Sequence, residues 1–329
     1  MKKHILGIDI GGTKCAVLLG NIESDTDSMI LDKLRFETHS ERGWKAVTDE
    51  LMQSVETVIS RNSLTADDLL ALGISCGGPL DSKRGVILSP PNLPDWDGVP
   101  IVEMIEKRFG IKAYLQNDAN ACALAEWKFG AGKGMRNMIF LTFGTGMGAG
   151  LILNGKLYSG QNDMAGEVGH IRLAEDGPMG YGKNGSFEGF CSGGGIGRLA
   201  QKTALAALKN GKSTLMCKSE AEIPSISAKT AAEAADMGDE TALEVYKICG
   251  EKLGEGLAIL VDILDPEAIV IGSIFARSGH LLIDSMKKTL HREALPQTAK
   301  CKILPAGLGE RIGDLASLGI AIDAIEGGK

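Results

Sequence analysis

The chain has 329 residues, 44% of them hydrophobic and 23% charged, which is typical of a globular protein with room for about two domains. Its formal net charge of -7 and its aromatic content of 5% argue against a broad nucleic-acid-binding surface. No segment approaches the roughly 20 apolar residues that a membrane span requires, and Asp9 interrupts the short apolar stretch near the start, so we expect neither a signal peptide nor a membrane anchor.

The predicted elements begin with a hairpin that recurs later in the chain. Residues 5–19 consist of an apolar run, a turn rich in Gly and Thr, and a second apolar run, which predicts two strands joined by a tight turn. Residues 139–153 have the same pattern. Because one unit recurs after roughly 130 residues, we predict two domains of similar plan.

Helical and strand patterns alternate around these hairpins. The spacing of apolar residues predicts helices over 44–59, 99–109, 119–129, 240–264 and 312–325, and strands over 69–75, 112–116 and 268–271. This alternation indicates an α/β fold with helices packed on mainly parallel or mixed sheets. We expect the polar, turn-rich segment 210–227 to be a surface insertion.

Both hairpin turns have the composition of an anion-binding loop. Glycines let several backbone N–H groups converge on one oxyanion, and threonine hydroxyls add donors. The first turn, Gly11-Gly12-Thr13-Lys14, also carries a cation, and Asp9 before it is placed to hold Mg²⁺ directly or through water. The second turn is Gly144-Thr145-Gly146. A single turn of this kind is as readily a structural turn as an anion-binding loop. Two of them in matching positions favour a polyphosphate bound between two domains.

Neither turn matches a Walker A loop or opens a helix as a Rossmann fingerprint does, which argues against a P-loop NTPase and a nucleotide-dependent dehydrogenase. Two further clusters are polar. Asp118, between a strand and a helix, is either an ordinary helix cap or a general base for a hydroxyl. Glu167 and His170 are either structural or point together at a polyhydroxylated ligand, whose hydroxyls such groups recognise.

Taken in order, these motifs resemble those of the ROK family of bacterial sugar kinases, and they cover nearly the whole chain. They are Asp9-Ile10-Gly11-Gly12-Thr13-Lys14, Gly77-Gly78-Pro79-Leu80-Asp81, Asn117-Asp118-Ala119-Asn120, Gly144-Thr145-Gly146-Met147-Gly148 and Glu167-Val168-Gly169-His170. The resemblance implies a two-domain actin-like ATPase fold of the ribonuclease H-like type, with a ligand cleft between two α/β domains. We predict an N-terminal domain of residues 1–118 plus 309–329 and a C-terminal domain of residues 119–308.

The resemblance also implies an activity, namely ATP-dependent transfer of the γ-phosphate to the 6-hydroxyl of glucose or a related hexose. Asp118 would take the hydroxyl proton, and Asp9 would help to place Mg²⁺. The residues expected at the sugar are Gly78, Asn117, Asp118, Glu167, His170 and Glu188. Those expected at the phosphates are Gly11, Gly12, Thr13, Lys14, Gly144, Thr145 and Gly146, with the adenine side near Gly272.

The chain departs from the family where a structural zinc is usually bound. The family carries C-x-C-G-x-x-G-C after its E-x-G-H motif, whereas this chain has Met179, Tyr181 and Ser186 at the cysteine positions. Since structural zinc requires thiolate or imidazole ligands, we predict no zinc site. The loop would then be held in another way, for example by packing of Tyr181, and His170 would keep only a role at the sugar.

Two alternatives to a glucose kinase stay open. Residues 120–134 are similar to N-acetylmannosamine kinases, so an N-acetylmannosamine or N-acetylglucosamine kinase is the first. The second is a non-catalytic sugar-binding sensor, which the retention of Asp9, Lys14 and Asp118 disfavours, as does the lack of room for a helix-turn-helix before Asp9.

The expected partners are ATP and a small sugar, with no nucleic acid and no membrane. The resemblance implies a homodimer. The seven cysteines are scattered without a C-x-x-C pair, which is typical of a reducing compartment, and we expect a cytoplasmic protein.

Overall fold

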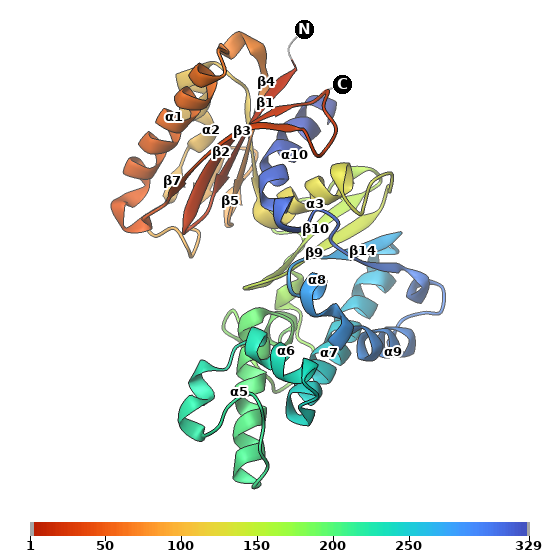
Figure 1. Ribbon diagram of the computed structural model, residues 1–329. Coiled ribbons are helices and arrows are strands. Elements are labelled where there is room, and N and C mark those ends of the chain that lie inside the picture. The colour runs from red at the N-terminus through yellow and green to blue at the C-terminus, as the bar shows by residue number, and fades with distance from the viewer. Residues whose placement is uncertain (1–2, 328–329) are drawn as a thin grey trace.

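The computed structural model describes residues 3–327, which contain two five-stranded sheets of the same plan (Figure 1). The first sheet has the order β3 (Ile30–Glu37), β2 (Lys14–Asn21), β1 (His4–Ile10), β4 (Leu69–Cys76) and β8 (Ala113–Asn117). The second has the order β11 (Lys156–Leu157), β10 (Met147–Leu153), β9 (Met138–Phe143), β14 (Ala268–Ile271) and β15 (Lys302–Pro305). In both, an antiparallel hairpin is extended by two parallel strands, so the predicted repeat of one unit is confirmed.

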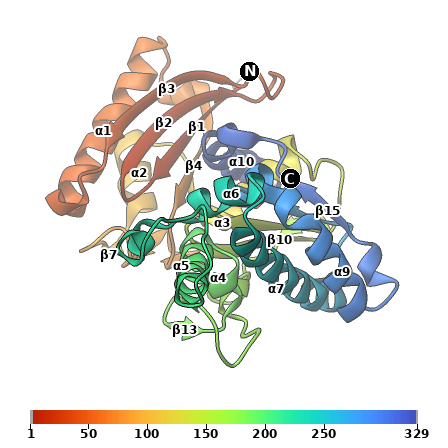
Figure 2. The ribbon, with the colours of Figure 1, turned by 60° about the horizontal axis from the view of Figure 1, so that its bottom comes forward.

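The first sheet is apolar along its central strands because helices cover both of its faces. Figures 1 and 2 show α1 (Gly43–Arg61) and α2 (Ile101–Phe109) on one side, while α10 (Ile312–Gly327) contacts β1 and β4 from the other. Gly73 of β4 permits this close approach, because a Cβ atom there would clash with the carbonyl oxygen of Ser317 in α10. The C-terminal helix therefore completes the core of the first sheet.

The second sheet is also covered on both faces, and successive residues of β9 alternate between two cores. Ile139 and Leu141 join the large core formed with α5 (Gly193–Lys209) and α7 (Glu240–Leu264), whereas Phe140 packs toward α3 (Asp118–Phe129). Other helices of the described residues are α4 (Phe187–Phe190), α6 (Ala228–Asp236), α8 (Ile274–Ser278) and α9 (Ile283–Glu293). Short strands outside the two sheets are β5 (Leu80–Asp81), β6 (Val86–Leu88), β7 (Asp97–Val99), β12 (Met179–Gly180) and β13 (Lys183–Asn184).

Helices α3 and α10 pack against each other between the two sheets (Figure 1). Near this contact, Glu126 of α3 is fully buried. Its carboxylate accepts hydrogen bonds from the backbone N–H groups of Ala131 at 2.8 Å, Gly307 at 3.0 Å and Leu308 at 2.9 Å. A buried carboxylate is tolerated only when it is satisfied in this way, so Glu126 connects the end of α3 to the segment that leads into α10.

The elements predicted from sequence are confirmed within one or two residues, and α7 and the strand β14 have the predicted bounds. The prediction for residues 210–227 is wrong in part. This segment is mostly exposed and is irregular apart from a short 3-10 helix, Glu220–Ser225. Met216, Cys217 and Ile226 are nevertheless buried in the core of the second sheet. The three apolar side chains lack helical or strand periodicity, so the pattern gave no sign that they anchor the segment.

Two further findings concern the whole described chain. Among residues 3–327, none of the helices combines the length and the apolar character needed to cross a bilayer. All seven cysteines are free.

Candidate active site

A cleft of about 800 Å³ lies between the two sheets, at the carboxyl ends of β4, β8 and β9. Strand register explains why motifs far apart in the sequence meet here. Ile10 pairs with Cys76 and Cys76 pairs with Asn117, so β1, β4 and β8 end level with one another. The residues that follow these strands are thereby brought to one edge of the first sheet, which is where ligands bind in open α/β sheets.

Most of the predicted site residues line this cleft. They are Gly78, Asn117, Asp118, Gly144, Thr145, Gly146, Glu167, His170 and Glu188. The first turn, residues 11–14, and also Asp9 and Gly272, lie outside its lining. The first turn and Gly272 border the cleft nevertheless, because Gly12 packs closely on Asn92 and Gly272 is followed by Ser273, and both of these neighbours line the cleft.

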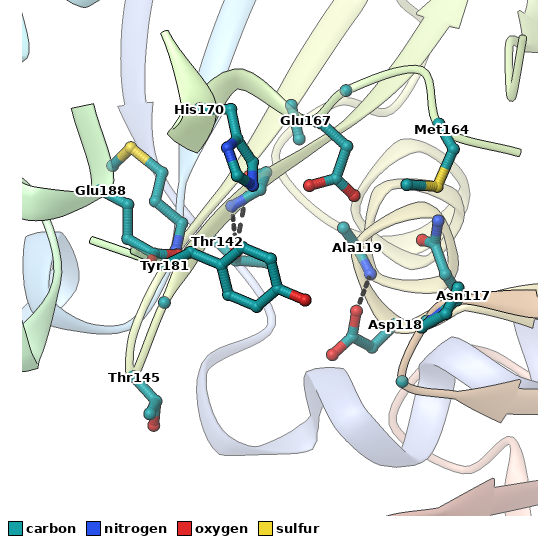
Figure 3. Close-up of a pocket in the computed structure, with 18 of the residues that line it drawn as sticks. Asn117, Asp118, Ala119, Thr142, Thr145, Met164, Glu167, His170, Tyr181 and Glu188 are labelled. Carbon is teal, nitrogen blue, oxygen red and sulfur yellow. Dashed lines mark hydrogen bonds between the residues drawn. The ribbon is translucent and has the colours of Figure 1, made fainter. Parts of the chain in front are cut away.

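Asp118 is the first residue of α3, where Asn117 forms the N-cap by accepting the N–H of Asn120 at 2.8 Å. The Asp118 carboxylate faces the cleft and accepts the backbone N–H of Ala119 at 2.8 Å (Figure 3). It is open to solvent in the cleft, yet the surrounding protein removes enough water to raise its pKa, against the lowering effect of the Ala119 hydrogen bond. The sequence left two roles open for Asp118, helix cap or general base. The side chain of Asn117 provides the cap, and the Asp118 carboxylate is directed at the cleft.

Asp9 is half-buried near the end of β1, behind the first turn. Desolvation raises the pKa of this carboxyl to about 6, and the negative charges of Asp314 and Asp118 add to the shift. A cation bound beside Asp9 would relieve the repulsion between these carboxylates. Within residues 3–327, no group of three or more His, Cys, Asp or Glu side chains is arranged to hold a metal ion.

Glu167 and His170 approach the cleft from the second sheet, on the loop that follows β11 (Figure 3). Desolvation raises the pKa of Glu167, while the neighbouring His170 opposes this and the carboxylates of Asp118 and Glu188 reinforce it. Glu188 of α4 is partly engaged, since one of its oxygens accepts the backbone N–H of Met147 at 3.0 Å. Glu188 therefore also anchors the second turn.

The two predicted phosphate turns are closed by their own hydrogen bonds. The N–H of Gly11 donates to the carbonyl of Lys14 at 3.0 Å, and the N–H of Gly144 donates to the carbonyl of Gly146 at 3.2 Å. The carbonyl of Gly144 in turn accepts the N–H of Gly193, the first residue of α5, at 2.7 Å. This contact brings the N-terminus of a 17-residue helix to the second turn, where its dipole favours an anion.

Residues 179–186, where the family pattern has its zinc-binding cysteines, are held by hydrogen bonds. Ser186 is fully buried and caps α4 by accepting the N–H of Gly189 at 3.1 Å. Met179 and Tyr181, at two other cysteine positions of the family pattern, offer a thioether and a phenol, which are poor ligands for zinc. The donor set does not fit a zinc ion, and the absence of zinc stays a prediction for metal analysis.

Two cleft residues escaped the sequence analysis as functional groups. Asp163 is buried and accepts both the N–H and the hydroxyl of Ser82, each at 2.8 Å, which joins the loop before Glu167 to the turn after β5. Tyr181 lines the cleft beside His170. Asp163 belongs to no recognisable motif. Tyr181 replaces a cysteine of the family pattern, and such a replacement alone does not indicate which role the new side chain has.

Comparisons with known proteins identify the family of the chain. The profile of the ROK family matches residues 5–323. A glucokinase of Streptomyces coelicolor is 32% identical over 319 residues, which are 96% of each chain. Among solved structures, a ROK family glucokinase from Streptomyces griseus in complex with glucose and AMPPNP has 32% identity and a TM-score of 0.74, covering 97% of this chain and 99% of that chain. A ROK hexokinase from Thermus thermophilus has 26% identity and a TM-score of 0.80, covering 98% and 99%.

These likenesses confirm the predicted fold, a two-domain actin-like α/β architecture. They extend over almost the full length of this chain and of its relatives. The chain belongs to the ROK family.

Proposed function

We propose that this protein is an ATP-dependent hexose kinase that transfers the γ-phosphate of ATP to the 6-hydroxyl of glucose or a related hexose. The observation that carries the proposal is the position of Asp118, whose carboxylate faces a cleft that Glu167 and His170 enter from the other sheet. The glucose and AMPPNP bound to the Streptomyces griseus relative support the same pair of substrates.

Asp118 is proposed as the general base. Phosphoryl transfer requires mainly positioning and charge neutralisation, and the base must accept the hydroxyl proton as the oxygen attacks. The Ala119 N–H holds one carboxylate oxygen, which orients the group at the start of a rigid helix. The raised pKa of Asp118 makes it a stronger proton acceptor than an aspartate with the ordinary pKa of 3.8.

The sugar is proposed to bind between the two walls of the cleft. Hydrogen-bonding groups suited to its hydroxyls come from the ends of β4 and β8 on one side and from the loop after β11 and α4 on the other. The residues assigned to the sugar are Gly78, Asn117, Asp118, Glu167, His170 and Glu188. A site with contacts from both sheets would exclude water once it closes, which limits wasteful hydrolysis of ATP.

The phosphates are proposed to lie along the two glycine turns, with the adenine side near Gly272. The residues assigned to them are Gly11, Gly12, Thr13, Lys14, Gly144, Thr145 and Gly146. The N-terminus of α5 adds a favourable dipole next to Gly144. Asp9 would hold Mg²⁺ directly or through water, and the ion would neutralise phosphate charge when bound. A single carboxylate fits this ion, since Mg²⁺ usually takes its other ligands from phosphate oxygens and water.

The domain division proposed is residues 1–118 plus 309–329 for the N-terminal domain and residues 119–308 for the C-terminal one. The packing of α10 on β1 and β4 supports the return of the chain to the first domain. We further propose a cytoplasmic homodimer that binds neither nucleic acid nor membrane. The net charge of -7 supports the exclusion of nucleic acid.

The activity is tested by coupling ADP release to an optical signal at saturating ATP and Mg²⁺. The panel of acceptors is glucose, mannose, fructose, allose, N-acetylglucosamine and N-acetylmannosamine. The proposal predicts the highest kcat/KM with glucose or a close relative, and NMR of the product should place the phosphate on O6. Highest activity with an N-acetylated sugar would support the alternative kinase. Absence of ADP release together with sugar binding in calorimetry would support a sensor.

A further inference from the structure

The β12–β13 hairpin, residues 179–184, stands where the family pattern places zinc ligands, and it is tied to the segment that carries His170. The ammonium group of Lys183 donates to the carbonyl oxygen of His170 at 2.6 Å. In the opposite sense, Arg172 donates to the carbonyl oxygen of Asn184 at 2.7 Å. Arg198 of α5 holds the first strand of the hairpin through the carbonyl of Met179. The hairpin is thus fixed on both strands relative to His170.

Tyr181 occupies the turn of this hairpin in the left-handed conformation, with φ of 43°. A bulky side chain rarely adopts this conformation, and backbone strain of this kind concentrates at functional sites. The residue is 69% exposed, yet it lines the cleft, and its ring meets the His170 ring edge-on with centroids 5.2 Å apart. In Figure 3 the phenol hydroxyl points into the space between Glu167 and Asp118. The turn therefore directs a hydrogen-bonding group at the proposed sugar position.

We propose that Tyr181 is a sugar-positioning and specificity-determining residue, which binds a hydroxyl of the hexose through its phenol and steadies the His170 ring beside it. This inference rests on the proposed function, because it assigns Tyr181 to the sugar side of that cleft. A tyrosine suits the task, since its ring is rigid and apolar while its hydroxyl both donates and accepts. The hairpin bonds fix the position of Tyr181 beside His170.

The test compares Tyr181→Ala and Tyr181→Phe with a control in the same hairpin, Met179→Ala. The Met179 side chain is exposed and does not line the cleft, and its backbone bond to Arg198 is kept in the variant. For Tyr181→Ala we expect the KM for sugar to rise about 10-fold or more, with kcat within about threefold and the KM for ATP within about twofold. Tyr181→Phe should raise the sugar KM by about three- to tenfold, as loss of one hydrogen bond predicts. Met179→Ala should resemble the wild type.

A second readout separates direct contact from a merely structural role. The kcat/KM of wild type and Tyr181→Phe is measured with glucose and with its 2-deoxy, 3-deoxy and 4-deoxy analogues. If the phenol binds one sugar hydroxyl, removal of that hydroxyl lowers kcat/KM less in Tyr181→Phe than in wild type. The inference would be overturned if wild type and Tyr181→Phe lost kcat/KM equally with each of the three deoxy analogues. It would also be overturned by a sugar KM for Tyr181→Ala within twofold of the Met179→Ala control.

Failure of the proposed function is distinguishable from failure of this inference. If the wild type releases no ADP with any sugar, calorimetry of sugar binding replaces the kinetic measurement. Weaker sugar binding by Tyr181→Ala than by Met179→Ala would then support the role of Tyr181 while the kinase proposal falls. Equal sugar affinities, or no sugar binding by the wild type, would overturn the inference as well.

Discussion

On the first-sheet side of the cleft, Asn117 and Asp118 follow directly from β8, whereas on the second-sheet side Glu167, His170 and Tyr181 lie on loops between β11 and α4. The first side is positioned by strand register and a helix N-terminus, which leave little freedom. The second is positioned by side-chain hydrogen bonds between loops. We infer that the first side carries the chemical step in addition to its contacts with the sugar, and that the second side supplies most of the affinity for the sugar. Loops are where a shared fold most readily acquires new specificity.

The largest expected effect is on the first side. Asp118→Asn keeps the size of the side chain but removes the proton acceptor, so kcat should fall about 100- to 10,000-fold. Steady-state ADP release at saturating glucose and ATP measures this. The matched control is Asp284→Asn, which changes an aspartate in the first turn of α9 outside the cleft and should leave kcat unchanged. A kcat for Asp118→Asn within tenfold of wild type would remove the general base from the account.

A substitution of Glu126, which connects α3 to the segment before α10, should affect the stability of the fold more than the catalytic activity. In Glu126→Gln an amide replaces a buried carboxylate that accepts three backbone N–H groups. At least one of these donors loses its acceptor, at a cost of about 1–3 kcal/mol in the free energy of unfolding. Chemical denaturation measures the loss, with exposed Glu103→Gln on α2 as the control. Equal unfolding free energies for the two variants would contradict the role assigned to Glu126.

A change on the recognition side should alter the KM for sugar. Asp163→Ala breaks both hydrogen bonds to Ser82 and frees the loop that leads to Glu167. We expect the KM for sugar to rise about three- to tenfold with little change in kcat, because the sugar-binding groups are less ordered while Asp118 is untouched. A fall in kcat at constant KM would instead assign Asp163 to the chemical step.

The pH dependence should report on Asp118. Because desolvation raises its pKa above the ordinary 3.8 and the ionised form is the base, kcat/KM should fall as the pH drops through that raised value.

The same pKa shift changes the free energy of unfolding in the opposite direction with pH. A carboxyl whose folded-state pKa is raised stabilises the fold fully below its unfolded pKa, and this contribution is lost as the pH rises through the folded pKa.

Asp118→Asn should therefore have a higher Tm than wild type at pH 7, and the difference should shrink toward pH 4. Thermal denaturation across this range measures the effect, which we expect to be the smallest of those described. A lower Tm at pH 7 would show that the Asp118 carboxylate stabilises the folded state.

The same contrast explains how much of the molecule was predictable. Apolar patterns predicted both hairpins and the helix after Asp118, and the resemblance to the ROK family predicted that its carboxylate lies at the site. The pair of hydrogen bonds between Asp163 and Ser82 was not predicted, because it joins residues 81 positions apart whose types are common on protein surfaces. The direction of Tyr181 depends on a positive φ at a non-glycine residue, which no local pattern predicts.

The division of the cleft into a chemical side and a recognition side is tested most directly by calorimetry of glucose binding to Asp118→Asn and Glu167→Gln in parallel. The account predicts that Asp118→Asn retains the wild-type Kd within about threefold, although it has lost turnover, and that Glu167→Gln binds glucose about 10-fold more weakly. The reverse pattern, with sugar affinity lost in Asp118→Asn and kept in Glu167→Gln, would contradict it.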